Sequence, residues 1–237
     1  MQEQDKDVVE LVIANKNYSS WSMRPWVLMR TLRIPFSERL LPFHANAGSG
    51  NFRNYSPSGR VPCLVDGALR IWDSLAIAEY LAEAHAEVWP RDRAARAWAR
   101  SAAAEMHSGF QALRNVCSMS VGVRVRLHQI SQPLQSDLSR LEALWESGLQ
   151  AHGGPWLGGA DFTAVDAFFA PVATRVQTYS LPLASIAGQY VQRLLQLPAV
   201  SEWISAGIAE PWRDAAHEAE VLAHGQLTQD LRAAPLR

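Results

Sequence analysis

Residues 61–82 read VPCLVDGALRIWDSLAIAEYLA, and this stretch decides the fold of the first part of the chain. Two short apolar runs flank Asp66-Gly67, a dipeptide typical of β-hairpin turns. Asp73 and Ser74 follow the second run and are favourable N-cap residues for the apolar segment after them. The stretch therefore predicts a β-hairpin that leads directly into a helix.

The residues before this hairpin predict two strands, a helix and a loop. Val8–Ala14 is a nearly continuous apolar run, which is typical of a strand buried on both faces. Ser22–Leu32 has apolar residues three and four apart and predicts a helix, and Phe36–Leu41 predicts a second strand. The polar stretch His44–Gly59 predicts a loop. Together with the hairpin, these elements predict a small α/β domain.

The second part of the chain has a different pattern. Ala- and Arg-rich segments with helical spacing replace the strands, and no strand alternation or internal repeat is visible. The tail after His217 is polar and is expected to dock loosely. The predicted architecture is therefore α/β plus all-α, a βαβ–ββα domain followed by an all-helical domain. Helices are predicted over residues 94–115, 134–151, 163–178, 186–197 and 200–208.

Composition excludes several classes of protein. Apolar residues make up 48% of the 237 residues and charged residues 19%, as in globular proteins. A net charge of −1 provides no basic surface for nucleic acid or an acidic membrane. Two cysteines, Cys63 and Cys117, form no disulfide framework, and with no secretory signal in the sequence we expect a cytoplasmic protein. The seven histidines show no ligand-like grouping, so no metal is expected.

Three serines lie where the first predicted strand passes into the first helix. A serine there acts as an N-cap, or it joins the positive end of the helix in binding an anion. Ser22 lies furthest into the helix and is the predicted N-cap, which leaves Ser19 on the incoming loop to face a ligand. Ser20 could serve either purpose. The same two interpretations, cap or anion site, apply to Asp73-Ser74.

Three segments taken together resemble the cytosolic glutathione S-transferases. They are NYSSWSMRPW at residues 17–26, NYSPSGRVPCLVDG at residues 54–67 and IWDSLAIAEYL at residues 71–81. The first is most similar to the zeta class, the maleylacetoacetate isomerases, whose motif runs S-S-C-S. Thr163 and Asp166 resemble the capping box that this family carries in a core helix.

The resemblance implies a fold and an assembly. It implies a thioredoxin-like glutathione-binding domain over residues 1–86, with a mixed sheet. An all-helical domain over residues 87–237 would then carry the pocket for the electrophile. The family is usually dimeric, so a homodimer is expected.

The resemblance also implies the residues of a glutathione site. Ser19 corresponds to the residue that hydrogen-bonds the glutathione sulfur, with Ser20 as the alternative. Such a hydroxyl would stabilise the thiolate, which is the nucleophilic form of a thiol. The backbone of Val61, before a Pro62 that the family holds cis, would pair with the cysteinyl part of glutathione.

The two ends of glutathione have further implied partners. Asp73 and Ser74 would bind the γ-glutamyl ammonium and carboxylate. His44 and Arg60 lie on loops where the family often places groups near the glycine end. Trp21 stands where the zeta motif has Cys, which argues against maleylacetoacetate isomerisation and against a thioltransferase that uses an enzyme-bound mixed disulfide.

Polar residues gather at helical spacing between residues 105 and 114. His107, Ser108 and Arg114 lie near one another on the predicted helix. They belong either to a solvated face with ordinary ion pairs or to a pocket that orients an anionic or carbonyl-bearing substrate. With Trp21 they form the predicted electrophile pocket.

The predicted function is therefore a glutathione transferase. A serine hydroxyl activates the thiol of glutathione, the co-substrate, for conjugation to a small hydrophobic electrophile. A glutathione-dependent isomerase or peroxidase on the same site is an alternative. A non-catalytic module that binds glutathione or a protein partner is another, because a fold alone does not establish a function. Small molecules are the expected partners, and nucleic acid, membrane and metal are not.

Overall fold

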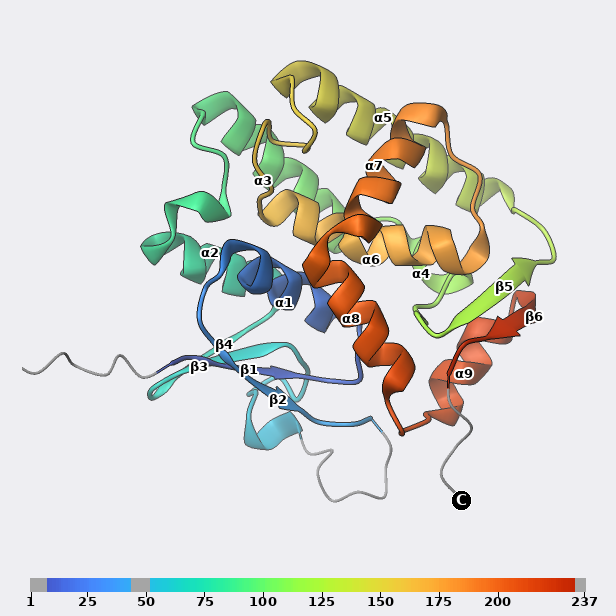
Figure 1. Cartoon of the computed structure of the whole chain (residues 1–237), viewed down its shortest axis with the longest axis horizontal. Helices are drawn as coiled ribbons and strands as arrows, with labels where there is room; N and C mark the ends of the chain where they lie inside the picture. Colours follow the sequence, from blue (N-terminus) through green and yellow to red (C-terminus); the bar gives the residue numbers. More distant parts are fainter. Residues whose placement is uncertain (1–7, 44–51, 233–237) are drawn as a thin grey trace, which may run out of the picture.

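A four-stranded mixed sheet of order β2-β1-β3-β4 organises the first part of the chain (Figure 1). β1 (Glu10–Ile13) pairs in parallel with β2 (Ser37–Leu40) and antiparallel with β3 (Cys63–Asp66). β3 forms the predicted hairpin with β4 (Leu69–Trp72). The computed structural model describes residues 8–43 and 52–232.

Helices connect these strands as the sequence predicts. α1 (Ser20–Leu32) joins β1 to β2, and α2 (Ser74–Ala84) follows the hairpin. Two short 3-10 helices, η1 (Phe52–Asn54) and η2 (Ala86–Val88), precede β3 and follow α2. Gly67 adopts a φ of +52° in the hairpin turn, a conformation that glycine adopts without steric cost.

A helical domain follows, so the predicted fold class is confirmed. α6 lies among the other helices and is buried along almost its whole length. It packs on α1 of the first domain as well as on α3 and α7. No helix of the described residues is long and apolar enough to cross a membrane. The helices are α3 (Arg93–Ser108), α4 (Gln111–Val116), α5 (Gln132–His152), α6 (Ala164–Tyr179), α7 (Ser185–Gln196), α8 (Pro198–Ala209) and α9 (Ala215–Leu222).

The single helix predicted over residues 94–115 is wrong, because the chain turns between α3 and α4. Gly109 ends α3, and a Cβ at this position would lie only 2.8 Å from the carbonyl oxygen of Glu105. Phe110 then adopts a left-handed φ of +59°. The carboxylate of Asp137 on α5 accepts a hydrogen bond from the backbone N–H of Leu113 at 2.9 Å and holds the start of α4.

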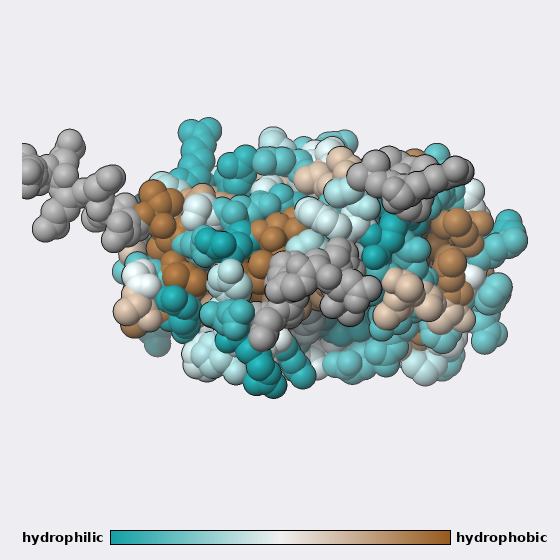
Figure 2. Space-filling model, turned by 90° about the horizontal axis from the view of Figure 1, so that it is seen from below, coloured by the Kyte–Doolittle hydropathy of each residue, from teal (hydrophilic) through white to brown (hydrophobic). Residues whose placement is uncertain are grey.

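The second domain also contains a small sheet that the sequence analysis missed. β5 (Val123–Leu127) pairs antiparallel with β6 (Gly225–Asp230). The alternation of VRVRL, with Val123 and Val125 buried, was the available signal. The expectation of a loosely docked tail after His217 is therefore wrong, because α9 and β6 are ordered. Figure 2 shows the face that carries β2 and α9, with separate apolar areas among polar side chains.

A buried carboxylate anchors the start of α6. Asp166 accepts hydrogen bonds from the backbone N–H groups of Thr163 and Leu157, both at 3.0 Å, and from the hydroxyl of Tyr190 on α7 at 2.9 Å. The first of these bonds belongs to the predicted capping box, which is confirmed. Burial raises the pKa of Asp166 to about 6, although the three hydrogen bonds act in the opposite direction.

Asp166→Ala is expected to lower the free energy of unfolding by about 3 kcal/mol or more. The reason is that three buried donors lose their acceptor, and each unsatisfied donor costs about 1–3 kcal/mol. Denaturation in urea at neutral pH measures the loss. Asp161→Ala is the matched control, because Asp161 is exposed just before α6. Equal stability of the two variants would contradict the anchoring role of Asp166.

Candidate active site

Two adjoining cavities open on the first domain, and one of them is also lined by residues of the second domain. The serine cavity has a volume of about 300 Å³, and the hairpin cavity has a volume of about 320 Å³. They share Trp21, Arg60 and Val61 as lining residues. The serine cavity is also lined by Ser19, Ser20, Arg175 and His217, and the hairpin cavity by Pro62, Trp72, Asp73 and Ser74.

The serines occupy different roles from those predicted, because α1 begins at Ser20. Ser19 is the N-cap, and its Oγ accepts a hydrogen bond from the backbone N–H of Ser22 at 3.3 Å. The prediction that Ser22 caps the helix is therefore wrong. Ser22 is fully buried, and its Oγ accepts hydrogen bonds from the Ser19 hydroxyl at 2.8 Å and from the N–H of Ala14 at 3.3 Å. Ser20 lines the cavity, and its hydroxyl has no hydrogen-bond partner within the described ranges.

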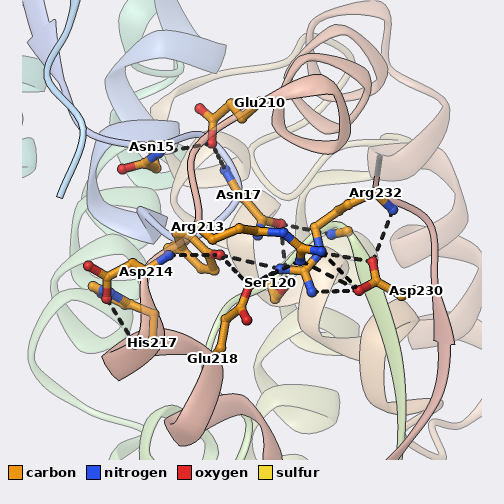
Figure 3. A network of polar contacts seen from close by, with 12 residues as sticks. Asn15, Asn17, Ser120, Glu210, Arg213, Asp214, His217, Glu218, Asp230 and Arg232 are labelled. Atoms are coloured by element: carbon orange, nitrogen blue, oxygen red, sulfur yellow. Dashed lines mark hydrogen bonds and ion pairs between the residues drawn. The ribbon is translucent and has the colours of Figure 1, made fainter. Parts of the chain in front are cut away.

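A carboxylate at the end of α8 fixes the loop that leads to Ser19. Glu210 accepts hydrogen bonds from the backbone N–H of Lys16 at 2.6 Å, the backbone N–H of Asn17 at 3.3 Å and the side-chain amide of Asn15 at 3.2 Å (Figure 3). Burial raises the pKa of Glu210, while these hydrogen bonds act against the increase. Glu210 of the second domain therefore helps to position the start of α1.

The hairpin cavity contains the polar pair that was predicted for the γ-glutamyl group. Asp73 has a φ of +78°, which is uncommon for a residue with a side chain, and its carboxylate accepts the N–H of Leu75 at 2.8 Å. Ser74 is buried at the first position of α2. The Val61–Pro62 peptide bond is cis, as the family resemblance implied.

A buried arginine lies behind this pair and was missed by the sequence analysis. Arg24 of α1 donates a hydrogen bond to the Oγ of Ser74 at 3.3 Å. Its guanidinium lies 4.2 Å from the ring centre of Trp21 and 4.8 Å from that of Phe168. Its Nε has no partner within the described part of the chain. The available signal was a charged residue between the apolar positions of the segment at residues 17–26.

Two of the predicted electrophile-pocket residues lie around Trp21. The His107 ring meets the Trp21 ring edge-on at 5.1 Å, and the Arg114 guanidinium lies 4.9 Å from the Trp21 ring centre. The Nε2 of His107 is 3.3 Å from the carboxylate of Asp73. Burial lowers the pKa of His107, and the nearby Asp73 carboxylate partly opposes this decrease. His107 thus connects α3 to Trp21 and Asp73, although it lines neither cavity.

The remaining predicted residues are less involved. Ser108 is exposed and donates to the carbonyl oxygen of Ala104 at 3.0 Å, so it points into neither cavity. Arg60 is exposed and lines both cavities. His44 lies outside the described residues.

A second buried arginine reaches the serine cavity from α6. Arg175 donates through Nε to the carbonyl oxygen of Cys117 at 2.8 Å. Burial lowers its pKa to about 10, and repulsion from Arg114 acts in the same direction. Burial also lowers the pKa of Arg24 well below its usual range, with repulsion from Arg114 and Arg175 adding to the effect. The three guanidiniums therefore create a positive potential that favours a bound anion.

The cysteines take no part in this arrangement. Cys63 and Cys117 are buried, and neither lines the two cavities. Burial raises the pKa of Cys63, and it raises the pKa of Cys117 to about 12, so both are poor thiolates. The described residues contain no cluster of histidine, cysteine or acidic side chains suited to a metal ion.

Comparison with known proteins gives matches over both domains. Residues 18–84 match the family model of the glutathione S-transferase N-terminal domain, and residues 123–206 match that of the C-terminal domain. A Caenorhabditis elegans protein named "probable maleylacetoacetate isomerase" is 26% identical over 172 residues, which cover 70% of this chain and 78% of that protein. A zeta-class glutathione S-transferase from Euphorbia esula is 33% identical over 123 residues, about half of each chain (51% and 55%).

Solved structures agree with this fold. A glutathione transferase homologue from Burkholderia, with bound glutathione, has a TM-score of 0.64 at 23% identity and covers 85% of this chain and 98% of its own. A theta-class glutathione S-transferase from Xanthomonas axonopodis, also with glutathione bound, has a TM-score of 0.61 at 20% identity, with coverages of 83% and 97%. At these identities the likeness concerns the fold.

Proposed function

Because the chain belongs to the glutathione S-transferase family, we propose that it binds glutathione across the two cavities and conjugates the sulfur to a small hydrophobic electrophile. The observation that carries the proposal is the continuity of these cavities. One end has the Asp73–Ser74 pair, the middle has Val61, and the other end has the serines at the start of α1. This order matches the order of groups along a γ-glutamyl-cysteinyl peptide.

The hairpin cavity offers a charge-complementary site for the γ-glutamyl group. The carboxylate of this group would accept hydrogen bonds from the Ser74 hydroxyl and from the free N–H groups at the start of α2. Arg24 supports Ser74 from behind and adds positive charge. The carboxylate of Asp73 would bind the ammonium group. Two opposite charges on the ligand therefore meet two opposite charges of the protein.

The serine cavity offers hydroxyl donors for the thiolate. The family resemblance assigns Ser19 as the residue that hydrogen-bonds the glutathione sulfur. In the structure, however, the Ser19 hydroxyl donates its hydrogen bond to Ser22. The Ser19 hydroxyl can donate to the sulfur if the Ser22 hydroxyl becomes the donor in the Ser19–Ser22 hydrogen bond. Rotation of the two hydroxyl groups allows this exchange. Ser20 needs no such change. The N-terminus of α1 and the three arginines add positive potential, which stabilises a thiolate relative to a thiol.

A glutathione-dependent isomerase is the second candidate function. Relatives from C. elegans and rat carry the name maleylacetoacetate isomerase, and Arg175 gives the serine cavity a guanidinium that suits a substrate carboxylate. Trp21 in place of the zeta-class cysteine favours conjugation instead. The two reactions differ in stoichiometry, because conjugation consumes glutathione and isomerisation returns it.

A homodimer is part of the proposal, and β4 with α2 is the surface that supports it. Leu69 and Trp72 are 55% and 45% exposed, and an apolar hollow beside them is lined by Ile71 and Leu75. In a monomer this apolar area would stay exposed to water, which is unfavourable, whereas a second copy would cover it. Glutathione bound in the hairpin cavity would then lie close to the interface, because Trp72 and Asp73 line both hollows.

Ser74→Ala is expected to weaken glutathione binding by about 1–3 kcal/mol, the loss of a hydrogen bond to a charged group. Isothermal titration calorimetry with glutathione measures the change. Ser101→Ala is the matched control, because Ser101 is exposed on α3 and donates only to the carbonyl oxygen of Ala97. A dissociation constant that is the same for all three proteins would contradict the γ-glutamyl site.

Replacement of the activating serine is expected to raise the pKa of the bound thiol. Thiolate absorbance against pH, recorded for the glutathione complexes of Ser19→Ala and Ser20→Ala, identifies the serine. Ser19→Ala should also lower the stability by about 0.5–2 kcal/mol, because it removes the N-cap of α1. If neither variant shifts the titration, activation by a serine hydroxyl is wrong.

Sedimentation velocity at micromolar concentration is expected to show a particle of twice the 26.3 kDa chain mass. Trp72→Glu should shift it toward monomer, because a charge would be buried at the interface. Trp212→Glu is the control, since Trp212 is an exposed tryptophan at the other end of the chain. A monomeric wild type would contradict the proposed dimer.

A further inference from the structure

The C-terminal segment supplies one wall of the serine cavity. His217 and Glu220 of α9 line this cavity together with Ser19 and Ser20. A hydrogen bond and an ion pair hold α9 in place, since Glu218 accepts hydrogen bonds from the Tyr18 hydroxyl at 3.0 Å and from Arg232 at 2.7 Å (Figure 3). α9 is therefore a fixed part of the site.

The imidazole of His217 is held on three sides. Its ring stacks on Phe43 with a centre distance of 4.5 Å and on Tyr18 with a centre distance of 5.2 Å. Its Nδ1 lies 2.8 Å from Oδ1 of Asp214. Stacking and the hydrogen bond together leave the ring little freedom to rotate. Such restraint is typical of a side chain that acts at a defined position.

The contact with Asp214 determines which ring nitrogen is available. Burial raises the pKa of Asp214, but hydrogen bonds from the side chain and backbone of His217 outweigh it, and the net effect is a lowered pKa. The carboxylate is thus charged at neutral pH and accepts the proton that Nδ1 carries. Nε2 of the neutral ring is then without a proton, and it has no hydrogen-bond partner among residues 8–43 and 52–232.

We propose that His217, oriented by Asp214, is the general base that removes the proton from the glutathione thiol in the serine cavity. The inference rests on the proposed function. It adds a base, which the serines at the start of α1 do not supply. The arrangement has a hydroxyl, an imidazole and a carboxylate, but the base acts on the ligand's thiol rather than on the serine.

The step balances without a further reactant. The S–H bond breaks, its proton moves to Nε2, and its electron pair stays on sulfur as the thiolate. The sulfur then forms a bond to the electrophilic carbon. When the electrophile is an activated double bond, the adjacent carbon takes the proton back from Nε2. Asp214 stabilises the imidazolium between these two transfers.

Several charged groups lie around His217. Asp214, Glu218 and Glu220 are the acidic groups there, and Arg213 and Arg175 are the basic ones. Tyr18, which stacks on the ring, and Arg60, across the cavity, are the other titratable groups that face it. Among these groups, His217 is the one that takes the thiol proton in the proposed step.

A purely structural role for His217 makes a different prediction. Asp214 is also the N-cap of α9, and it accepts the backbone N–H of His217 at 3.1 Å. If stacking and capping were the whole role, His217→Phe would retain the stacking and Asp214→Asn would retain the cap, since Asn caps helices as well as Asp. Both variants would then keep full activity.

Kinetics of the full-length variants with glutathione and an activated-alkene electrophile test the proposal. His217→Phe is expected to lower kcat/KM by about 100-fold or more, the usual contribution of a general base, and to remove the ionisation of the base from the pH profile. Asp214→Asn should lower kcat/KM in the same direction, because its amide favours the opposite tautomer. Glutathione affinity and the melting temperature should stay close to those of the wild type. His224→Phe, at an exposed histidine after α9, is the control.

Chemical rescue separates base catalysis from packing. His217→Ala should recover activity when free imidazole is added, and it should not recover with pyrazole, a ring of the same size that is a far weaker base. Equal rescue by both rings, or a His217→Phe variant with an unchanged pH profile and a kcat/KM within twofold of the wild type, would overturn the proposal.

Thiolate absorbance keeps this result separate from the proposed function. If the wild type binds glutathione but conjugates none of a panel of electrophiles, conjugation as the function is wrong. The thiolate titration of the complex then decides on His217, since an equal titration in wild type and His217→Phe overturns its role as base. If glutathione does not bind at all, both proposals fall.

Discussion

The burial of α6 is the constraint on which the other elements depend. Its first turn is anchored by the Asp166 carboxylate, which joins the preceding loop to Tyr190 of α7. The rest of the helix packs on α3 and α7 within its own domain and on α1 of the other domain. Since α1 carries Ser20, Trp21 and Arg24, the position of α6 sets the distance between the two walls of the candidate site.

Like charges are buried close together within this interface. Arg24 and Arg175 are buried near the half-buried Arg114, which opposes the protonation of both, and Arg175 also opposes that of Arg24. Burial of like charges is unfavourable unless an anion lies close by. Aromatic faces of Trp21 and Phe168 compensate Arg24 in part. Under the proposed function, a thiolate in the serine cavity and a carboxylate at Ser74 would add negative charge beside these guanidiniums.

The C-terminal segment completes the site from the other side. Glu210 holds the loop before Ser19, and Glu218 and Arg232 hold α9 against Tyr18. β6, near the end of the chain, is fixed by its pairing with β5. The serine cavity is therefore assembled from separate parts of the sequence, which include the start of α1, the loop before β3, α6 and α9.

The sequence by itself determined the features that depend on neighbouring residues. The hairpin at Asp66-Gly67, the polar start of α2 and the Thr163–Asp166 capping box follow from local backbone chemistry, and so they could be predicted. The family resemblance rests on the same local motifs. It allowed the serine, proline and aspartate-serine positions of the candidate site to be named in advance.

Only the tertiary structure decided the features that depend on distant residues. The break at Gly109 requires the contact of α4 with Asp137, and β5 needs β6 as a partner, which lies far along the chain. Likewise, Ser19 rather than Ser22 caps α1 because the N–H of Ala14 and the Ser19 hydroxyl occupy the oxygen of Ser22. The positions of Arg24, Arg175 and His217 around the site also depend on distant residues. Long-range packing brings these side chains to the site, and no local sequence pattern predicts that they meet there.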